Sequence, residues 1–541
     1  MLNRGKGPAV HSLRAQADRR RYQEHMKRLL EREPNLYLKQ AAVTEIRTEG
    51  GHVSGVVTQL GAEYRVRAVI VAAGTYLDST VITGQCVLHS GPDGLRPAPE
   101  LSQCLRALGL RMRRFKTGTP PRINARSVDF SQMEVQTGDK TPLPFSFSTE
   151  HPPENQAVCY LTYTTEETHR VIRENLDRSP IYSGVIEGVG PRYCPSIETK
   201  IVRFPDKPRH QLFIEPMGLD TEELYIQGFS SSMPEEVQLE MLHSVKGLEH
   251  AEIMRPAYAI EYDCIDPTAL YPTLEYKHIE GLYGAGQFNG SSGYEEAAVQ
   301  GFVAGVNAAR KLKGETPFIL GREQAYIGTL IDDLVTKGTN EPYRMMTSRS
   351  EYRLILRQDN ADERLAPIGH ELGLVSDETL QKVVGKYDAV RREIKRLEHT
   401  GVGASDALNA LLSARGTAEV HDGSPLIALL RRPQLTYDDL RDFDAGCRAF
   451  PPALAESVEI AVKYEGYIRR QMAEVAEFAR LERRAIPEDI DYAKIDGLRL
   501  EAREKLAAIR PQNLGQAGRI SGVSPADVAA LMLYITSKTR D

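Results

Sequence analysis

The spacing of apolar residues predicts one helix followed by several short strands in the first part of the chain. Residues 8–33 carry apolar side chains at helical spacing, and Pro34 would end that helix. Residues 35–67 contain four short runs typical of strands, with Gly50 and Gly51 as a hairpin turn. We therefore expect a helix that leads into a small antiparallel sheet.

A different kind of strand follows this sheet. Residues 69–73 read VIVAA and end at Gly74. Such an apolar run suits a buried strand of a parallel sheet, with a ligand at its carboxyl edge. The pattern returns at residues 281–286, and residues 110–270 between them are mixed, which indicates an inserted domain. From about residue 320 the pattern is helical to the end of the chain.

Charge and cysteine usage narrow the class of protein. The 541 residues carry a net charge of -6, which argues against a non-specific nucleic-acid coat but not against a local basic patch. The six cysteines form no C-x-x-C pair, so we expect neither a structural zinc site nor a disulfide framework. No apolar run approaches 18 residues, and we expect a soluble, cytoplasmic protein with no membrane segment.

The most distinctive stretch, residues 281–301, reads GLYGAGQFNGSSGYEEAAVQG. A short strand leads into a turn in which Gly284, Gly286 and Gly290 permit close backbone approach to a flat or phosphorylated ligand. A helix of small residues would begin near Gly293, and its amide groups can face an anion. The pattern is typical of a nucleotide-binding turn, and a tight strand-to-helix joint without a ligand is the alternative.

Several long stretches resemble, in the same order, signature blocks of one family. Residues 281–301 closely resemble the flavin-contacting segment of the flavoprotein subunit of bacterial tRNA uridine 5-carboxymethylaminomethyl modification enzymes, the MnmG/GidA family. The further blocks are RFKTGTPPRINARSVDF (114–130), GPRYCPSIETKIVRF (190–204), YAIEYDCIDPTALYPTLE (258–275), PYRMMTSRSEYRLILRQDNADERL (342–365) and IRPQNLGQAGRISGVSPAD (509–527). The resemblance covers essentially all of the chain.

The resemblance implies an α/β fold with an FAD-binding Rossmann-like domain, an inserted α/β domain and an all-helical C-terminal domain. We expect the FAD-binding domain in two pieces, residues 1–109 and 271–325. Residues 110–270 would form the inserted nicotinamide-nucleotide or substrate domain, residues 326–470 a helical domain, and residues 471–541 a helical subdomain that binds tRNA and a partner.

The beginning of the chain departs from the family pattern. Family members begin with a strand, a G-x-G-x-x-G turn and a helix that hold the ADP half of FAD. Here Met1 is followed at once by LNRGKGPAVHSLRAQ, and Gly5 and Gly7 follow no strand. We therefore expect a truncated FAD-binding domain that on its own holds no FAD. A start-site error, a deletion and a fragment are all open as explanations.

The resemblance implies modification of the wobble uridine of certain tRNAs. A carboxymethylaminomethyl or aminomethyl group would be built at uridine C5, with methylenetetrahydrofolate as one-carbon donor, FAD as redox cofactor and NADH as its reductant. The implied assembly is a homodimer that forms a heterotetramer with the GTPase subunit MnmE. Two alternatives stay open: a non-catalytic scaffold that binds tRNA or MnmE, and the folate- and FAD-dependent tRNA uridine methyltransferase, which is shorter at its C-terminal end.

The resemblance also assigns cofactor contacts. At the glycine turn these are Gly286, Gln287, Asn289 and Gly293, and Val43 is a further candidate. The expected nicotinamide-nucleotide block comprises Gly190, Pro191, Arg192, Tyr193, Cys194, Pro195, Ser196, Ile197, Glu198, Thr199, Lys200, Ile201, Val202, Arg203 and Phe204.

Cys194 is the candidate catalytic nucleophile. Uracil C5 is a weak nucleophile, and addition of a thiolate or carboxylate at C6 would activate it. Arg192 and Lys200 favour a thiolate, while Pro191 and Pro195 stiffen the loop. The alternative is that Cys194 only shapes a loop that binds NADH.

A basic stretch offers a site for an anionic ligand. Residues 116–122 (KTGTPPR) join the basic run at 111–114 to a rigid turn, which could hold a folate glutamate tail, a pyrophosphate or a tRNA phosphate. A solvated basic loop is the alternative. Glu261 and Asp263 offer carboxylates near the flavin segment, with structural and catalytic roles both open.

A second basic group is the candidate tRNA surface. Arg349, Arg353 and Arg357 are spaced four apart, which on a helix would place them on one face beside Tyr352. Together with Arg344 they are expected to contact tRNA, since arginine and aromatic side chains bind phosphates and bases. The alternative is a surface helix stabilised by its own counter-charges.

Overall fold

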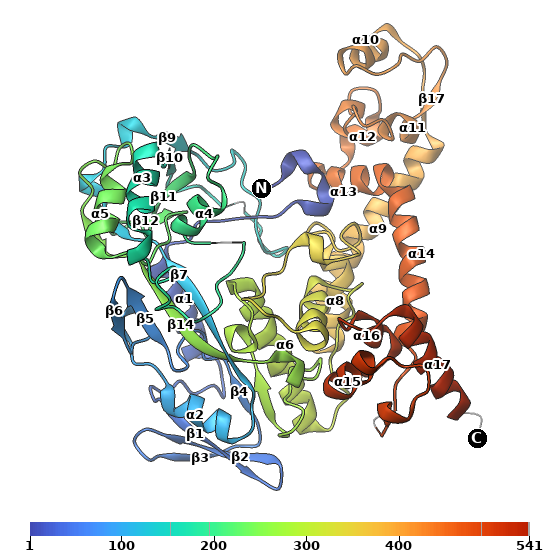
Figure 1. The fold of residues 1–541 in the computed structure, drawn as a ribbon. Helices are drawn as coiled ribbons and strands as arrows, with labels where there is room; N and C mark the ends of the chain where they lie inside the picture. Colours follow the sequence, from blue (N-terminus) through green and yellow to red (C-terminus); the bar gives the residue numbers. More distant parts are fainter. Residues whose placement is uncertain (152, 194, 488, 539–541) are drawn as a thin grey trace.

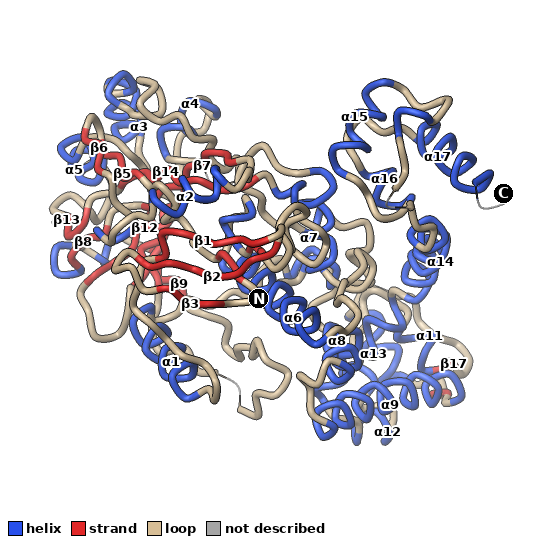
Figure 2. Tube along the Cα trace, turned by 90° about the horizontal axis from the view of Figure 1, so that it is seen from below, coloured by secondary structure: helices blue, strands red, loops and turns tan. Residues whose placement is uncertain are grey.

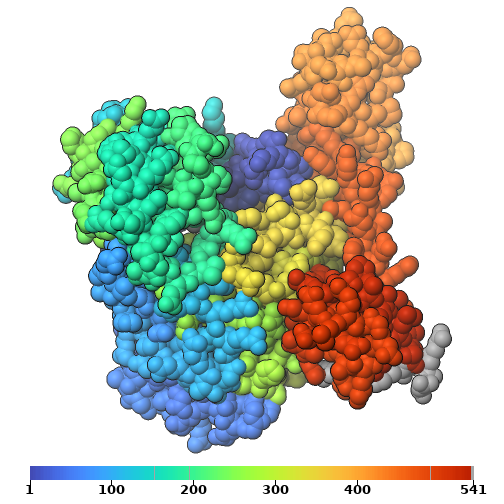
Figure 3. Space-filling model, viewed as in Figure 1, coloured from blue at the N-terminus to red at the C-terminus, as the bar shows by residue number. Residues whose placement is uncertain are grey.

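The computed structural model describes residues 1–151, 153–193, 195–487 and 489–538. Its larger sheets gather in one half of the molecule and most of its long helices in the other (Figures 1 and 2). The first residues of the chain lie between the inserted domain and the helical half (Figure 3). The C-terminal helices lie on the far side of the helical half from the sheets (Figure 1).

The N-terminal helix is shorter than the sequence predicts. It is preceded by two short 3₁₀ helices, η1 (Arg4–Lys6) and η2 (Pro8–Val10). The chain is then extended, and α1 spans only Arg19–Arg32, so the predicted helix over 8–33 is wrong for its first part. Nε2 of Gln16 donates to Oε1 of Glu215 at 2.6 Å, which holds the stretch across the inserted domain. Asp18 caps α1 with its side chain.

An antiparallel sheet follows, as predicted, but with three strands instead of four. The strands are β1 (Val43–Glu49), β2 (His52–Thr58) and β3 (Glu63–Arg65). Gly50 and Gly51 form the predicted hairpin turn with φ of 58° and 84°. Residues 35–40 form no strand, because they are exposed and pair with no neighbouring strand in the structure.

The two apolar strands that the sequence singled out pair with each other. β4 (Val69–Val71) and β15 (Leu282–Gly284) run parallel, with Val69 opposite Leu282. The first domain is therefore assembled from segments on both sides of the insertion. The prediction of a fully buried strand is wrong for Ile70, which is 38% exposed because this sheet has only two strands among the described residues.

A second sheet joins the first domain to the insertion. Its strand order is β6-β5-β14-β7, with β5 (Thr80–Thr83), β6 (Cys86–Leu88), β7 (Met112–Thr119) and β14 (Tyr258–Ile265). The chain enters the inserted domain through β7 and returns through β14, and these strands pair over their whole length (Figure 1). The helix α2 (Pro99–Ala107) packs beside β1.

The inserted domain is built on a six-stranded antiparallel sheet. Its order is β13 (Ile253–Arg255), β8 (Arg122–Asn124), β12 (Glu223–Gln227), β11 (Gln211–Pro216), β10 (Cys159–Tyr163) and β9 (Glu134–Gln136). Its helices are α3 (Glu166–Glu174), α4 (Ile197–Arg203) and α5 (Glu235–His243). Ile123, Ile214 and Ile226 of the sheet are fully buried in one hydrophobic core with Met241 of α5.

The second half of the chain is helical, as predicted. Its main helices are α6 (Tyr294–Lys313), α7 (Tyr326–Asp332), α8 (Ala361–Glu371), α9 (Asp377–His399), α10 (Asp406–Ala414), α11 (Leu426–Leu430), α12 (Ala445–Ala449), α13 (Pro452–Lys463), α14 (Glu465–Glu482), α15 (Leu500–Ile509), α16 (Leu514–Arg519) and α17 (Pro525–Lys538). Residues 390–462 and 486–531 contribute two separate hydrophobic cores. Among the described residues, none of the helices has the length and apolar character to cross a membrane.

Candidate functional site

The carboxyl ends of β4 and β15 meet at the glycine turn. Gly74 follows β4 with φ of 55°, and a Cβ atom on it would lie 3.6 Å from Oε1 of Gln287. Gly286 has φ of 70°, and a Cβ atom there would lie 3.1 Å from Cβ of Ala297 in α6. The left-handed backbone and the close helix leave no room for a side chain at this position.

A buried hydrogen-bond network holds the turn. Ser291 donates to the carbonyl oxygen of Gly286 at 2.9 Å and accepts from Nε2 of Gln300 at 2.7 Å. Nδ2 of Asn289 donates to Oε1 of Gln300 at 2.9 Å. The other amide atom, Oδ1 of Asn289, is buried without a hydrogen-bond partner. Buried polar atoms without partners are rare, which makes this oxygen a candidate acceptor for a ligand at the turn.

Residues 187–193 form a loop beside the turn. Glu261 of β14, 5% exposed, accepts hydrogen bonds from the main-chain N–H of Glu187 at 2.7 Å and from that of the next residue. Near the other end, the hydroxyl of Tyr193 donates to the carbonyl oxygen of Pro342 at 2.9 Å. Glu261 is thus a structural anchor for the loop, one of the two roles that the sequence left open.

Arg344 connects this loop to the glycine turn. Its guanidinium lies 5.5 Å from the ring centroid of Tyr193 and donates to the carbonyl oxygen of Ser292 at 2.8 Å. Next to it, Nε of Arg192 lies 2.7 Å from Oε2 of Glu341. The structure therefore brings together residues that were predicted in three separate blocks of sequence.

The rest of the 190–204 block enters the core of the inserted domain. Ile197 and Ile201 of α4 are buried in that core, so they pack the helix and do not face the loop. Glu198 is fully buried, and burial raises the pKa of its carboxyl. Cys194 lies outside the described residues, and its catalytic role stays a prediction.

Comparison with known proteins identifies the family. Residues 1–316 match the model of a family described as glucose inhibited division protein A. Residues 377–472 and 474–541 match models described as the C-terminal helical domain and the C-terminal helical bundle of the tRNA modifying enzyme MnmG/GidA. The chain belongs to the MnmG/GidA family. This finding confirms the resemblance seen in the sequence.

Relatives of the MnmG/GidA family are similar over the whole chain. Proteins of Caldicellulosiruptor saccharolyticus and Alkaliphilus oremlandii, both called tRNA uridine 5-carboxymethylaminomethyl modification enzyme MnmG, are 56% and 57% identical to it. The matches cover 99% and 100% of this chain and 86% of each relative. The solved structure of Aquifex aeolicus GidA is 46% identical, covers 99% of this chain and 86% of that chain, and has a TM-score of 0.89. The predicted fold class is confirmed.

The basic stretch around Lys116 is a strand in this member of the MnmG/GidA family. Most of residues 111–119 lie in β7, so the alternative of a solvated basic loop is wrong there. Arg113 Nη2 lies 2.7 Å from Oδ2 of Asp266, and Arg114 Nη1 lies 3.1 Å from Oδ1 of Asp263, so the acids that follow along β14 neutralise this run. Lys116 is buried beside Gly190 of the loop.

The predicted arginine surface is only partly present. Residues 347–349 form a 3₁₀ turn (η10, Thr347–Arg349) and the following residues are turns, so the prediction of one helical face is wrong. Arg349 lies 4.3 Å from the ring centroid of Tyr343 and Arg353 is exposed. Arg357 is buried, and its Nε donates to Oδ1 of Asp359 at 3.0 Å. A chain bend at Ser350 separates what the spacing had aligned.

Two further residues can now be placed relative to the glycine turn. Val43 begins β1, in a different sheet from the turn, and its assignment to a cofactor stays a prediction. The sequence analysis missed Tyr343, whose main chain pairs with the turn at Ser291. The sequence contains no periodic signal for this contact, because residues 341–346 form no long strand or helix.

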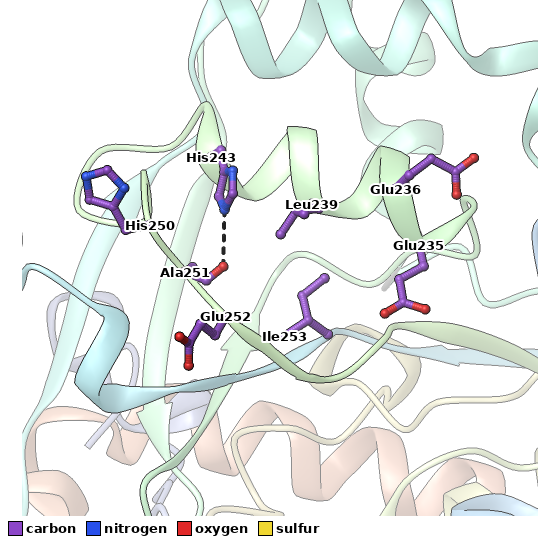
Figure 4. Close-up of a pocket in the computed structure, with 8 residues that line it drawn as sticks. All are labelled: Glu235, Glu236, Leu239, His243, His250, Ala251, Glu252 and Ile253. Atoms are coloured by element: carbon purple, nitrogen blue, oxygen red, sulfur yellow. Dashed lines mark hydrogen bonds between the residues drawn. The ribbon is translucent and has the colours of Figure 1, made fainter.

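A hollow of about 780 Å³ lies elsewhere, on the inserted domain (Figure 4). It is lined by Glu235, Glu236, Leu239, His243, His250, Ala251, Glu252 and Ile253. Nε2 of His243 lies 3.2 Å from the carbonyl oxygen of Ala251, and Glu252 accepts from Asn124 at 3.1 Å. Glu236 forms an ion pair with Arg178. These groups serve the local structure, and the glycine turn remains the candidate site.

Proposed function

We propose that this chain is an FAD-dependent enzyme that modifies the wobble uridine of tRNA at C5, adding a carboxymethylaminomethyl or aminomethyl group. The observation that carries the proposal is the glycine turn with its unpartnered Asn289 Oδ1, beside the loop at 187–193. A family whose relatives are called tRNA uridine 5-carboxymethylaminomethyl modification enzymes supports the substrate class.

The residues at the turn fit the ring of a flavin. Gly286, in its left-handed conformation, packs the turn closely against Ala297 of α6, and the Asn289 amide oxygen offers an acceptor to a ring N–H. The N-terminus of α6 follows directly and favours negative charge. When bound, FAD supplies redox chemistry to the reaction. Gln287, half-buried next to Gly74, would orient the ring edge.

The loop at 187–193 would bring the reactants to the turn. We infer that NADH and methylenetetrahydrofolate bind along this loop, with Lys116 beneath it as a buried cation for their anionic groups. Cys194, by its place in the sequence, is the candidate nucleophile for C6 of the uracil ring, which would make C5 reactive. The fixed loop would exclude water from the ring edge.

The helical half would bind the tRNA and the partner protein. Arg344 and Arg349 lie near the turn through their contacts with Tyr193 and Tyr343. Together with the exposed Arg353 they would contact tRNA phosphates. We further propose the assembly that the family resemblance implies, a homodimer joined to the GTPase MnmE. The match of both C-terminal helical models favours this function over the tRNA uridine methyltransferase alternative.

The test is complementation of a bacterium that lacks its own MnmG protein. Because the truncated FAD-binding domain is expected to hold no FAD on its own, the gene for this chain is joined to the N-terminal strand-G-x-G-x-x-G-helix unit of a family member. This fusion, or its Gly286→Val variant, is expressed and the tRNA nucleosides are measured by mass spectrometry. We expect the C5-modified uridine to return with the wild-type fusion and not with the variant. Gly301→Ala is the matched control, because Gly301 lies within α6 with open space around its Cα atom. This variant should restore the modified uridine. Unmodified uridine with the wild-type fusion would overturn the proposal.

A further inference from the structure

Tyr343, which lies outside the glycine turn in sequence, is hydrogen-bonded to the main chain of the turn. The main-chain N–H of Tyr343 donates to the carbonyl oxygen of Gly290 at 2.9 Å, and its carbonyl oxygen accepts from the N–H of Ser292 at 2.7 Å. Two main-chain hydrogen bonds on either side of Ser291 therefore hold the part of the turn that leads into α6. The position of Tyr343 sets the position of this backbone.

The side chain of Tyr343 is held by a buried carboxylate. Its hydroxyl donates to Oδ2 of Asp333 at 2.7 Å, and both residues are 2% exposed. Asp333 begins a π-helical segment (η9, Asp333–Lys337) that continues α7, a geometry that is common at functional sites. Burial raises the pKa of Asp333, but the charges of Arg322 and Lys337 and the hydrogen bonds from Lys337 and Tyr343 together outweigh burial. The pKa therefore lies below its usual value, and the carboxyl is ionised.

Arg322 joins this carboxylate to its neighbour in the chain. Nη1 of Arg322 donates to Oδ1 of Asp333 at 2.8 Å and to Oδ2 of Asp332 at 3.0 Å, and the residue is 6% exposed. Removing one member of such a buried group leaves an uncompensated charge, so the loss of one contact is expected to weaken the others.

The group ends on the C-terminal subdomain. Arg519, the last residue of α16, donates to both carboxylate oxygens of Asp332. Its Nε lies 2.6 Å from Oδ2 and its Nη2 lies 2.8 Å from Oδ1. Arg519 also pairs with Glu482 at the end of α14. A bidentate contact of this kind fixes orientation as well as distance.

We propose that Arg519 is a positioning residue through which the C-terminal helical subdomain, residues 486–538, sets the geometry of the glycine turn. The connection runs from Arg519 through Asp332, Arg322 and Asp333 to Tyr343, and from its main chain to Gly290 and Ser292. A displacement of α16, as when a large ligand binds this subdomain, changes the hydrogen bonds that position the main chain of the turn. The consequence for tRNA modification rests on the proposed function, whereas the mechanical coupling does not.

The test is hydrogen–deuterium exchange of the full chain, read by mass spectrometry on peptides that contain residues 288–293 and 341–346. Arg519→Gln keeps a polar side chain but removes the bidentate grip. We expect exchange of the turn peptides to rise about tenfold, because a charged hydrogen-bonded pair no longer holds them. Arg519→Lys, which keeps the charge, should lie between the variant and the wild type.

The matched control is Arg499→Gln. Arg499 makes an equivalent bidentate contact with the buried Asp527 inside the same subdomain, with Nη2 and Nε at 2.7 and 3.0 Å from Oδ2, and has no contact with Asp332. We expect faster exchange near residues 520–530 and wild-type exchange at the turn.

A second variant tests the same connection without changing a residue of the C-terminal helical subdomain. Tyr343→Phe removes only the hydroxyl that reaches Asp333 and should loosen the turn peptides while residues 499–527 exchange as in the wild type. In complemented cells, Arg519→Gln should lower the rate of tRNA modification with little change in tRNA affinity. Wild-type exchange at the turn in both Arg519→Gln and Tyr343→Phe would overturn the inference, whatever the outcome for modification.

Discussion

The ammonium group of Lys277 lies 2.6 Å from the main-chain oxygen of Ile509, the last residue of α15. The same group donates to the carbonyl oxygen of Thr268 at 2.6 Å, so one lysine joins the first domain to the C-terminal subdomain. Burial lowers the pKa of Lys277 to about 8, although the charge of Asp266 opposes this. The folded chain therefore binds fewer protons than the unfolded chain above about pH 8, up to the normal lysine pKa of about 10.5.

This contact predicts that stability rises with pH. Between pH 7.5 and 9.5 the wild type should gain about 2 kcal/mol in the free energy of unfolding relative to Lys277→Met. The reason is that folding requires Lys277 to release its proton, and the free-energy cost of this release falls as the pH rises. Urea unfolding at the two pH values measures the difference. Lys311→Met is the control, since its carboxylate neighbours raise the pKa of Lys311 and keep it charged throughout. Parallel pH dependence in the wild type and Lys277→Met would contradict the lowered pKa.

Gly286 is expected to tolerate no β-branched side chain. Gly286→Val places a Cβ atom 3.1 Å from Cβ of Ala297 in a left-handed conformation. We expect a loss of about 2–4 kcal/mol in the free energy of unfolding, from backbone strain and overpacking together. Denaturant unfolding gives the value. Gly301→Ala has open space around it and should be neutral or stabilising by up to about 1 kcal/mol. Equal stability of the two variants would show that the turn is not tight.

Glu261 should control the order of the loop at 187–193. Glu261→Ala leaves two main-chain N–H groups without their acceptor, which costs about 2 kcal/mol and frees the loop. Trypsin should then cleave after Arg192, whose side chain is exposed, several times faster than in the wild type. Glu187→Ala, an exposed side chain in the same loop, is the control and should leave the cleavage rate unchanged. Slow cleavage in Glu261→Ala would mean that the loop is held by other contacts.

The arginines at 349–357 should separate into two kinds. Arg353 is exposed, and Arg353→Ala should weaken tRNA binding and make its logarithmic salt dependence shallower by about one unit for each phosphate that the protein no longer neutralises. Arg357 is buried against Asp359, so Arg357→Ala should lower the free energy of unfolding and leave the salt dependence of the folded protein unchanged. Filter binding at several salt concentrations, with thermal unfolding of the same samples, distinguishes them. A shallower salt dependence in Arg357→Ala would place that side chain on the tRNA surface after all.

The sequence by itself determined the family, the fold class and the location of the glycine turn. These follow from local signals: the apolar strand that leads into Gly284, the small residues of α6 and the long family-specific blocks. The hairpin at Gly50-Gly51 and the helical second half could also be predicted from the sequence, because turn chemistry and helical periodicity depend on only a few neighbouring residues.

The tertiary structure alone decided which of those segments meet. The extended stretch before α1 looks helical in sequence, but Glu215 of the inserted domain holds Gln16 and straightens it. The spacing of Arg349, Arg353 and Arg357 suggested one face, yet the chain turns at Ser350 and buries the third arginine. The hold of Tyr343 on the turn, and of Arg519 on Asp332, joins residues far apart in the chain. Such contacts depend on long-range packing, which outweighs local propensity and leaves no period in the sequence.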